Sequence, residues 1–144
     1  MDLCEALMNE GADCARDRLA ERAVSIHDAE GVHTVLVLDS RNESLEIDHP
    51  FGKKSFEFVY APARLSADGV IERLVARIAE PSRVTVASND AMVRESARVS
   101  GAIAISASDL YDWIGACERQ LIQDAERRRK TNEKEWRNGI DFDF

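Results

Sequence analysis

Three aspartates follow segments with the composition of β-strands, and they are the side chains best placed to do chemistry. Asp39 ends an apolar run, Asp68 follows a second run after a short loop, and Asp90 follows a third. Carboxylates gathered at one edge bind hard cations such as Mg²⁺ or Mn²⁺, and such a metal activates water and steadies a phosphate. Glu72, one turn after Asp68, could add a carboxylate or pair with a nearby arginine. The same aspartates equally suit ordinary helix capping, so both roles stay open.

The elements that position these acids alternate between strands and helices. Apolar spacing predicts strands over 33–39, 56–60, 84–87 and 102–105. Predicted helices are a short one around 3–8, three that end near Gly31, Pro81 and Gly101, and a last one that starts at Ser106. Residues 40–54 read as a loop. The alternation after residue 55 predicts right-handed crossovers and a mostly parallel sheet, in which ligands bind outside the carboxyl ends of the strands.

The run 33–39 is nearly all apolar and rich in β-branched residues. Such a run is typical of a strand that is buried on both faces of a parallel sheet. The sequence therefore predicts that Asp39 ends a strand that is buried on both faces.

The charge balance limits how this chain could meet nucleic acid. The chain has 144 residues, 19 basic and 27 acidic, and a formal net charge of −8. This argues against a protein that coats nucleic acid through a broad basic field, although a local basic patch can still act. The segment Arg127–Lys130 is such a patch, and it is either a solvated helix face or an RNA contact. Trp113 is predicted to be in the core, and Trp136 to be exposed or to dock a partner.

Other familiar sites are not apparent. The cysteines are odd in number and lack CxxC spacing, which argues against a disulfide framework and a zinc site; they are Cys4, Cys14 and Cys117. The three histidines show no metal spacing, and Ser88 has no recognisable histidine partner for a hydrolytic triad. No membrane span or signal peptide is visible, so we expect a cytoplasmic protein without a membrane partner.

Four motifs in order carry a resemblance to a known family. They are Thr34-Val-Leu-Val-Leu-Asp39, Ser66-Ala-Asp68-x-x-Ile71-Glu72-Arg-Leu74, Val84-Thr-Val-Ala-Ser88-Asn-Asp90 and Gly101-Ala-x-x-Ile105-Ser106. Between about residues 12 and 121 the chain resembles the YacP-like NYN domain family of PIN-like nucleases. The resemblance implies a Rossmann-like three-layer α/β/α PIN-like fold over residues 1–121, followed by a charged C-terminal helix and tail over 122–144. It also implies a metal-dependent ribonuclease that uses Mg²⁺ or Mn²⁺, with RNA and the ribosome as partners.

The resemblance also assigns the acids. Asp68 matches the acid of the family's Ala-Asp element, and Asp90 matches that of the Ser-Asp element, with Asn89 inserted between serine and aspartate. Asp39 matches the aspartate that ends the second family strand. The implied catalytic residues are therefore Asp68, Asp90 and Asp39, and the implied metal ligands are Asp68, Asp90 and Glu72. Gly69 stands where relatives often carry a further acid.

The N-terminal end of the chain departs from the family pattern. The family begins with a strand that leads into a Val-Asp-Gly-Tyr-Asn type motif, and nothing of the kind precedes Met1-Asp-Leu-Cys4. The resemblance thus implies an N-terminally truncated domain whose first strand, central in the sheet, is missing together with its acid, which leaves neighbouring strand edges unpaired.

Three readings follow from this departure. The first is a metal-dependent ribonuclease whose upstream DNA encodes, in frame, an apolar strand that ends in Asp-Gly. The second is a non-catalytic module that binds RNA or the ribosome. The third is a remnant that aggregates or needs a partner strand.

Overall fold

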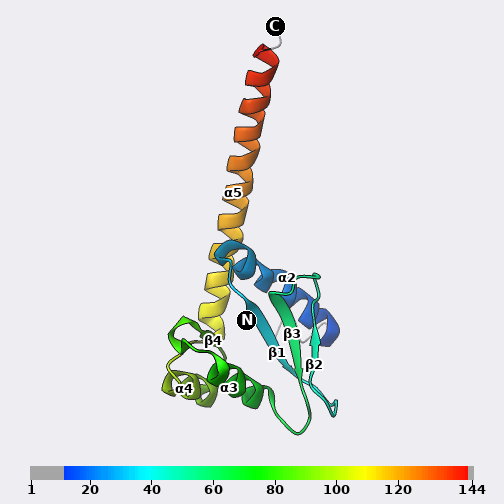
Figure 1. Ribbon diagram of the computed structural model, residues 1–144, viewed down its shortest axis with the longest axis vertical. Coiled ribbons are helices and arrows are strands. Elements are labelled where there is room, and N and C mark those ends of the chain that lie inside the picture. The colour runs from blue at the N-terminus through cyan, green and yellow to red at the C-terminus, as the bar shows by residue number, and fades with distance from the viewer. Residues whose placement is uncertain (1–11, 143–144) are drawn as a thin grey trace.

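The computed structural model describes residues 12–142, and Figure 1 shows their arrangement. The elements in chain order are α2 (Ala12–Glu30), β1 (Thr34–Asp39), β2 (Glu46–Asp48), β3 (Phe56–Ala61), α3 (Ala67–Arg77), the 3₁₀ turn η1 (Pro81–Arg83), β4 (Thr85–Ala87), α4 (Ala91–Val99), β5 (Ile103–Ile105) and α5 (Ala107–Phe142). The predicted strands and the four predicted helices that end or start at named residues are confirmed within one to four residues. The short helix predicted around 3–8, which includes Cys4, lies outside the described residues.

The described strands form two separate sheets. In the first, β1 and β3 run parallel with Asp39 opposite Ala61, and β2 pairs antiparallel with the other edge of β3. In the second, β4 and β5 run parallel with Ala87 opposite Ile105. Two of the three strand pairings are therefore parallel, as the alternation of strands and helices predicts.

The short strand β2 is an element that the sequence does not predict. Its residues Glu46–Asp48 fall in the segment read as a loop, and all three are exposed. An exposed three-residue strand leaves no apolar alternation in the sequence, because its formation depends on pairing with β3 rather than on burial. The prediction of a loop over 40–54 is wrong at these three positions.

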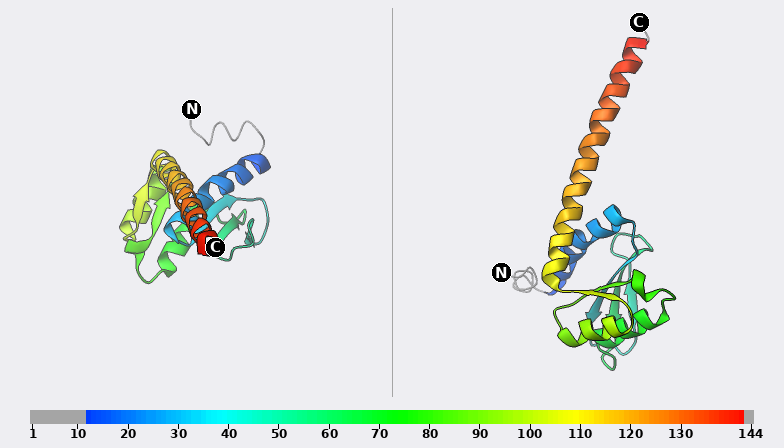
Figure 2. Two further views of the ribbon diagram at one scale, coloured as in Figure 1. Left: turned by 90° about the horizontal axis from the view of Figure 1, so that it is seen from above. Right: turned by 90° about the vertical axis from the view of Figure 1, so that its left-hand side faces the viewer.

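Helices cover both faces of the first sheet. On one face, α2 and α5 pack on each other and on the sheet, around the fully buried side chains of Phe56, Phe58 and Ile114. On the other face, Val70 of α3 packs against Val59 of β3. The second sheet packs against α3 and α4 in a cluster of its own. Figure 2 shows the same arrangement, with α5 crossing the domain above the sheets.

The strand β1 is less buried than its sequence predicts. Every residue from Thr34 to Leu38 is only partly buried, whereas four of the six residues of the neighbouring strand β3 are buried. The prediction that β1 is buried on both faces is therefore wrong for the structure described. The physical reason is that β3 has a strand on each edge, while β1 has a described neighbour on one edge only.

Two of the three predicted helix ends, those near Gly31 and Gly101, are confirmed by backbone geometry. Gly31 follows α2 with φ of 65°, and its N–H donates to the His27 carbonyl oxygen at 3.0 Å. Gly101 follows α4 with φ of 94°. Both values lie in the left-handed region that glycine adopts without a steric penalty. At the start of α5, the Ser106 hydroxyl accepts a hydrogen bond from the Asp109 N–H at 3.1 Å.

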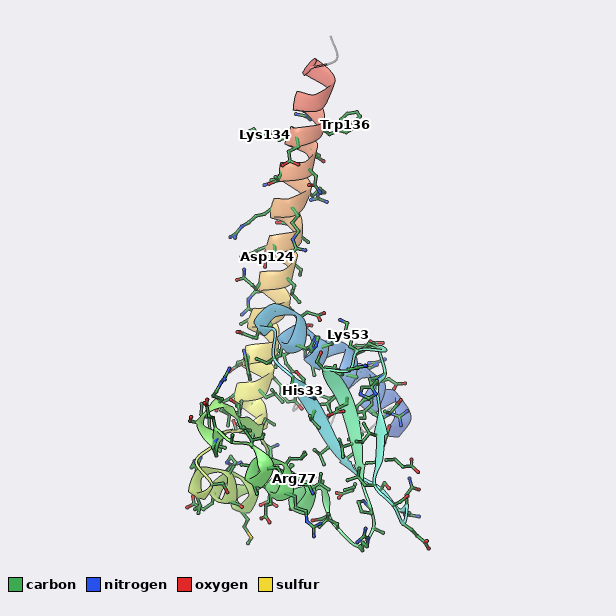
Figure 3. All side chains as sticks on the ribbon, viewed as in Figure 1. His33, Lys53, Arg77, Asp124, Lys134 and Trp136 are labelled. Carbon is green, nitrogen blue, oxygen red and sulfur yellow. The ribbon has the colours of Figure 1, made fainter. Side chains whose placement is uncertain are left out.

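The last helix, α5, is continuous over 36 residues and projects from the domain (Figure 1). It passes through residue 121 without a break, so the predicted division at 121/122 falls within one helix and stays a prediction. Trp113 packs against the core as predicted. The part from 122 to 142 is about 30 Å long, at 1.5 Å per residue. It carries the exposed segment Arg127–Lys130 and Trp136, which is 70% exposed and labelled in Figure 3. No helix among the described residues is long and apolar enough to cross a membrane.

Candidate functional site

Asp39 and Asp68 both lie at the N-terminus of α3. The Asp39 carboxylate accepts a 2.8 Å hydrogen bond from the Ala67 N–H, 28 residues further along the chain. Ser66 is the N-cap residue, and its hydroxyl accepts a 3.3 Å hydrogen bond from the Gly69 N–H. Asp68 lies in the first turn and is exposed. The structure therefore brings two of the three predicted acids to one helix end.

Asp90 lies at the N-terminus of α4, where it is the N-cap residue. Its carboxylate accepts a 2.9 Å hydrogen bond from the Met92 N–H. Two hydrogen bonds hold the turn before Asp90. The Ser88 hydroxyl accepts one from the Asp90 N–H at 3.1 Å, and the Ser88 carbonyl oxygen accepts one from Arg94 Nη1 at 2.8 Å. The capping role that the sequence left open for Asp39 and Asp90 is thus present in the structure, and each cap uses one carboxylate oxygen.

Asn89 is a site residue that sequence reasoning missed. Its side-chain oxygen accepts a 3.2 Å hydrogen bond from the N–H of Ala107, the first residue of α5. The residue that ends the turn after β4 therefore caps the helix that follows β5. Asp39 has the equivalent role in the other sheet, because it ends β1 and accepts a hydrogen bond from the first residue of α3, the helix that follows β3. The N-termini of α3, α4 and α5 are consequently held at the carboxyl ends of the strands.

Helix N-termini lie at this edge, and three arginines lie near the acids in the sequence. Helix N-termini have partial positive charge, which favours nearby carboxylates and phosphates. Arg41 follows β1, Arg64 precedes α3, and Arg94 lies in α4. Sequence reasoning did not single out these arginines, although one of them lies within four residues of each predicted aspartate. The edge thus combines acids that suit a cation with bases that suit a phosphate.

Glu72 points towards α4. Its carboxylate accepts a 3.1 Å hydrogen bond from the Ser96 hydroxyl, which ties α3 to α4. With a rise of 1.5 Å per residue, this contact lies about 6 Å along α3 from Asp68 and about 9 Å along α4 from Asp90. Among residues 12–142, no group of three or more His, Cys, Asp or Glu side chains is arranged to hold a metal ion. The assignment of metal ligands and catalytic residues stays a prediction.

The perturbed pKa values within the described part of the chain lie away from this edge. Hydrogen bonds with His27 and Lys53, both 2.9 Å long, hold the pKa of Asp28 below its ordinary value. Burial, reinforced by the nearby Glu30 carboxylate, raises the pKa of the free Cys117 thiol. Asp28 joins α2 to Lys53 in the loop before β3, and Cys117 joins α5 to Glu30 of α2.

Two histidines meet one carboxylate at the opposite end of the first sheet. Glu57 of β3 contacts His33 Nε2 at 3.1 Å and His49 Nε2 at 3.3 Å. The contact with His49 holds the loop after β2 against β3. Within the described part of the chain, Glu57, His33 and His49 are not arranged so that together they could hold a metal ion.

A family model and solved structures match this chain. A model of the YacP-like NYN domain matches residues 2–143. The chain belongs to the YacP-like NYN domain family. This NYN domain is similar in fold to the crystal structure of Rae1 (YacP) from Bacillus subtilis, with a TM-score of 0.65 and 24% identity, over 83% of this chain and 68% of that chain. The crystal structure of a tryptophan-to-leucine variant of Rae1 matches with a TM-score of 0.62 and 22% identity, over 78% of this chain and 65% of that chain.

This NYN domain corresponds to part of each solved chain. It spans about two thirds of each of these solved chains. A search of curated protein sequences found no match. At these identities the solved structures establish the mixed α/β fold of the domain, and the family match places it among the PIN-like nucleases.

Proposed function

We propose that this NYN domain is a metal-dependent RNA endonuclease domain that hydrolyses phosphodiester bonds in RNA. The observation that carries the proposal is the gathering of Asp39, Asp68 and Asp90 at the N-termini of α3 and α4, beside arginines, in a chain of a PIN-like nuclease family. A nuclease needs acids that bind a cation and bases that bind the substrate phosphate, and this edge offers both.

The donors fit Mg²⁺ or Mn²⁺ in chemistry. Both ions prefer oxygen ligands, and Mg²⁺ commonly uses one or two carboxylates and completes its shell with water and substrate phosphate. We assign Asp68 and Asp90 as the ligands. Asp39 and Glu72 are second candidates, because Asp39 also caps α3 and Glu72 accepts from Ser96. When bound, the metal supplies activation of water and neutralisation of phosphate charge.

We also propose that the architecture is the three-layer α/β/α arrangement of PIN-like domains. The support is that α2 and α5 share one face of the first sheet while α3 covers the other. In that arrangement the acids lie at the carboxyl edge between the helical layers, where ligands of open α/β sheets bind.

The test is cleavage of a labelled single-stranded RNA by the 144-residue chain with added Mn²⁺ or Mg²⁺, and with EDTA. We expect cleavage only with the metal. Asp68→Asn and Asp90→Asn should slow it by about 100-fold or more, because several kcal/mol of transition-state stabilisation are lost. The matched control is Asp112→Asn, an exposed acid on α5, which should cleave like the parent. Cleavage that persists in EDTA, or a loss that Asp112→Asn shares, would refute the assignment.

The projecting part of α5 favours a second candidate function, a non-catalytic RNA- or ribosome-binding module. The segment Arg127–Lys130 is exposed on a helix that reaches beyond the domain. A module of this kind would bind RNA with an affinity that falls steeply with salt, and would not cleave it. Metal-dependent cleavage that is lost in Asp90→Asn excludes this alternative.

A further inference from the structure

Two arginines lie on adjoining loops beside the acids of the candidate site. Arg41 follows the end of β1 by two residues, Arg64 follows the end of β3 by three, and both are exposed. The Asn42 carbonyl oxygen accepts a 2.9 Å hydrogen bond from the Ala63 N–H. The residue after Arg41 is thus bonded to the residue before Arg64, so the two arginines belong to neighbouring backbone segments. We call Arg41 and Arg64 the arginine pair.

Further hydrogen bonds hold the two loops in place. The Ser40 N–H donates to the Ala61 carbonyl oxygen at 3.1 Å, which ties the loop after β1 to the end of β3. The Asp39 carboxylate accepts from the Ala67 N–H at 2.8 Å, which ties the same loop to the start of α3. The backbone of the arginine pair is therefore fixed relative to the N-terminus of α3. A ligand does not have to order these loops when it binds, which lowers the cost of binding.

The arginine pair has no side-chain partner within the described part of the chain. Neither guanidinium forms a hydrogen bond or an ion pair with another described residue, although the chain has 27 acidic side chains against 19 basic ones. Other arginines are engaged, since Arg94 donates to the Ser88 carbonyl oxygen at 2.8 Å and Arg98 contacts Glu95 at 3.6 Å. The arginine pair therefore keeps its N–H donors available for a ligand.

The chemistry of the arginine pair suits a phosphate group. A guanidinium stays protonated in proteins, and its planar fork of N–H donors matches two oxygens of one phosphate. Two such groups on adjoining segments can hold the same phosphate from two directions. The phosphate could belong to a nucleic-acid backbone or be free in solution, and the experiments below distinguish these sources.

The arginine pair and helix α4 lie on different sides of α3. Glu72 of α3 accepts a 3.1 Å hydrogen bond from Ser96 of α4, so α4 packs beside α3. The connection from β3, which carries Arg64, reaches α3 from the other side, as Figure 1 shows. A phosphate bound through a metal at Asp68 and Asp90 would lie towards α4. The arginine pair would then meet a different phosphate of the same strand.

We propose that the arginine pair binds one backbone phosphate of the RNA strand, next to the phosphodiester bond that the domain cleaves. The proposal rests on the proposed function for the cleaved bond, whereas the phosphate contact itself needs neither metal nor cleavage. Contacts to backbone phosphates carry no sequence information, so this contact should be independent of base sequence. It selects a substrate strand that continues beyond the cleaved bond, on the side of β1 and β3.

Fluorescence anisotropy of a short labelled single-stranded RNA, titrated with the full chain in EDTA, tests the contact without cleavage. Arg41→Gln and Arg64→Gln should each weaken binding about 10-fold, because each removes charged hydrogen bonds to the phosphate. The matched control is Arg77→Gln, an exposed arginine in the last turn of α3, about 14 Å along the helix from Asp68, which should bind like the parent. Absence of saturable binding by the parent, or equal affinities of all three variants, would overturn the proposal.

The double variant tests whether one phosphate is shared. Loss of either side chain disrupts the same contact, so the combined loss should stay well below the ~100-fold product of two independent losses. The slope of log affinity against log salt should fall by about 0.7, as for one phosphate. A full ~100-fold loss would contradict a shared phosphate. Displacement of the RNA by millimolar inorganic phosphate at constant ionic strength would make free phosphate the ligand and overturn the proposal.

Steady-state cleavage with Mn²⁺ separates this proposal from the proposed function. A contact to a neighbouring phosphate is the same in the ground state and the transition state, so Arg41→Gln and Arg64→Gln should raise KM about 10-fold and leave kcat unchanged. A kcat lowered as far as in Asp90→Asn, at unchanged KM, would place the arginines at the cleaved phosphate and refute the proposal. If the parent cleaves no RNA, the proposed function fails, and the anisotropy titration still decides the phosphate contact. An unchanged KM in both variants of an active chain refutes the contact and leaves the proposed function standing.

Discussion

Replacement of Asp90 by asparagine and by alanine separates its capping role from its charge. The carboxylate accepts a 2.9 Å hydrogen bond from the Met92 N–H at the start of α4. Asparagine is as good an N-cap as aspartate, so Asp90→Asn keeps the hydrogen bond and removes only the negative charge. Asp90→Ala removes both. The two variants therefore differ in stability while they share the loss of charge.

The expected magnitudes follow from the two contributions. Loss of a charge at the helix N-terminus costs about 0.3–1 kcal/mol, and the low end applies because Asp90 is exposed. Loss of the cap costs about 1 kcal/mol more. Urea unfolding followed by circular dichroism should therefore rank the parent above Asp90→Asn, and Asp90→Ala about 1 kcal/mol lower still. For a chain of this size, 1 kcal/mol corresponds to roughly 3 °C in Tm.

Cleavage assays on the same variants complete the test. If the charge at Asp90 binds a metal, both variants should lose activity equally, although Asp90→Asn is nearly as stable as the parent. Full activity in Asp90→Asn would show that the cap, rather than the charge, is what the domain needs. Equal stability of Asp90→Asn and Asp90→Ala would show that the 2.9 Å hydrogen bond stabilises nothing, and would refute the structural half of the reasoning.

Three further predictions concern the core, the pH dependence and the projecting helix. Ile114→Ala should lower the free energy of unfolding by about 2–5 kcal/mol in a urea titration, because this side chain is 0% exposed. His27 and Lys53 lower the pKa of Asp28, so the ionised carboxylate stabilises the fold above the ordinary carboxylate range. This stabilisation is lost as pH falls through the lowered pKa, and Asp28→Asn should flatten that part of the profile of Tm against pH, measured by thermal unfolding. Replacing the four residues 127–130 by glutamine should reduce the slope of log affinity for single-stranded RNA against log salt by about 3, since each phosphate contact contributes about 0.7.

The features that the sequence predicted correctly are local. The caps at Ser66, Asp90 and Ser106 act within three residues of the chain, and the helix ends at Gly31 and Gly101 rest on glycine's access to positive φ. Each of these caps and helix ends involves residues within one helical turn of each other. Residue type and spacing therefore suffice to locate them.

The features that were missed join residues that are far apart in the sequence. The hydrogen bond from Ala67 to Asp39 spans 28 residues, that from Ala107 to Asn89 spans 18, and that from Ser96 to Glu72 spans 24. No spacing rule identifies these partners, because the packing of the sheets determines which strand end meets which helix. The acids could be named from the sequence, but their partners could not.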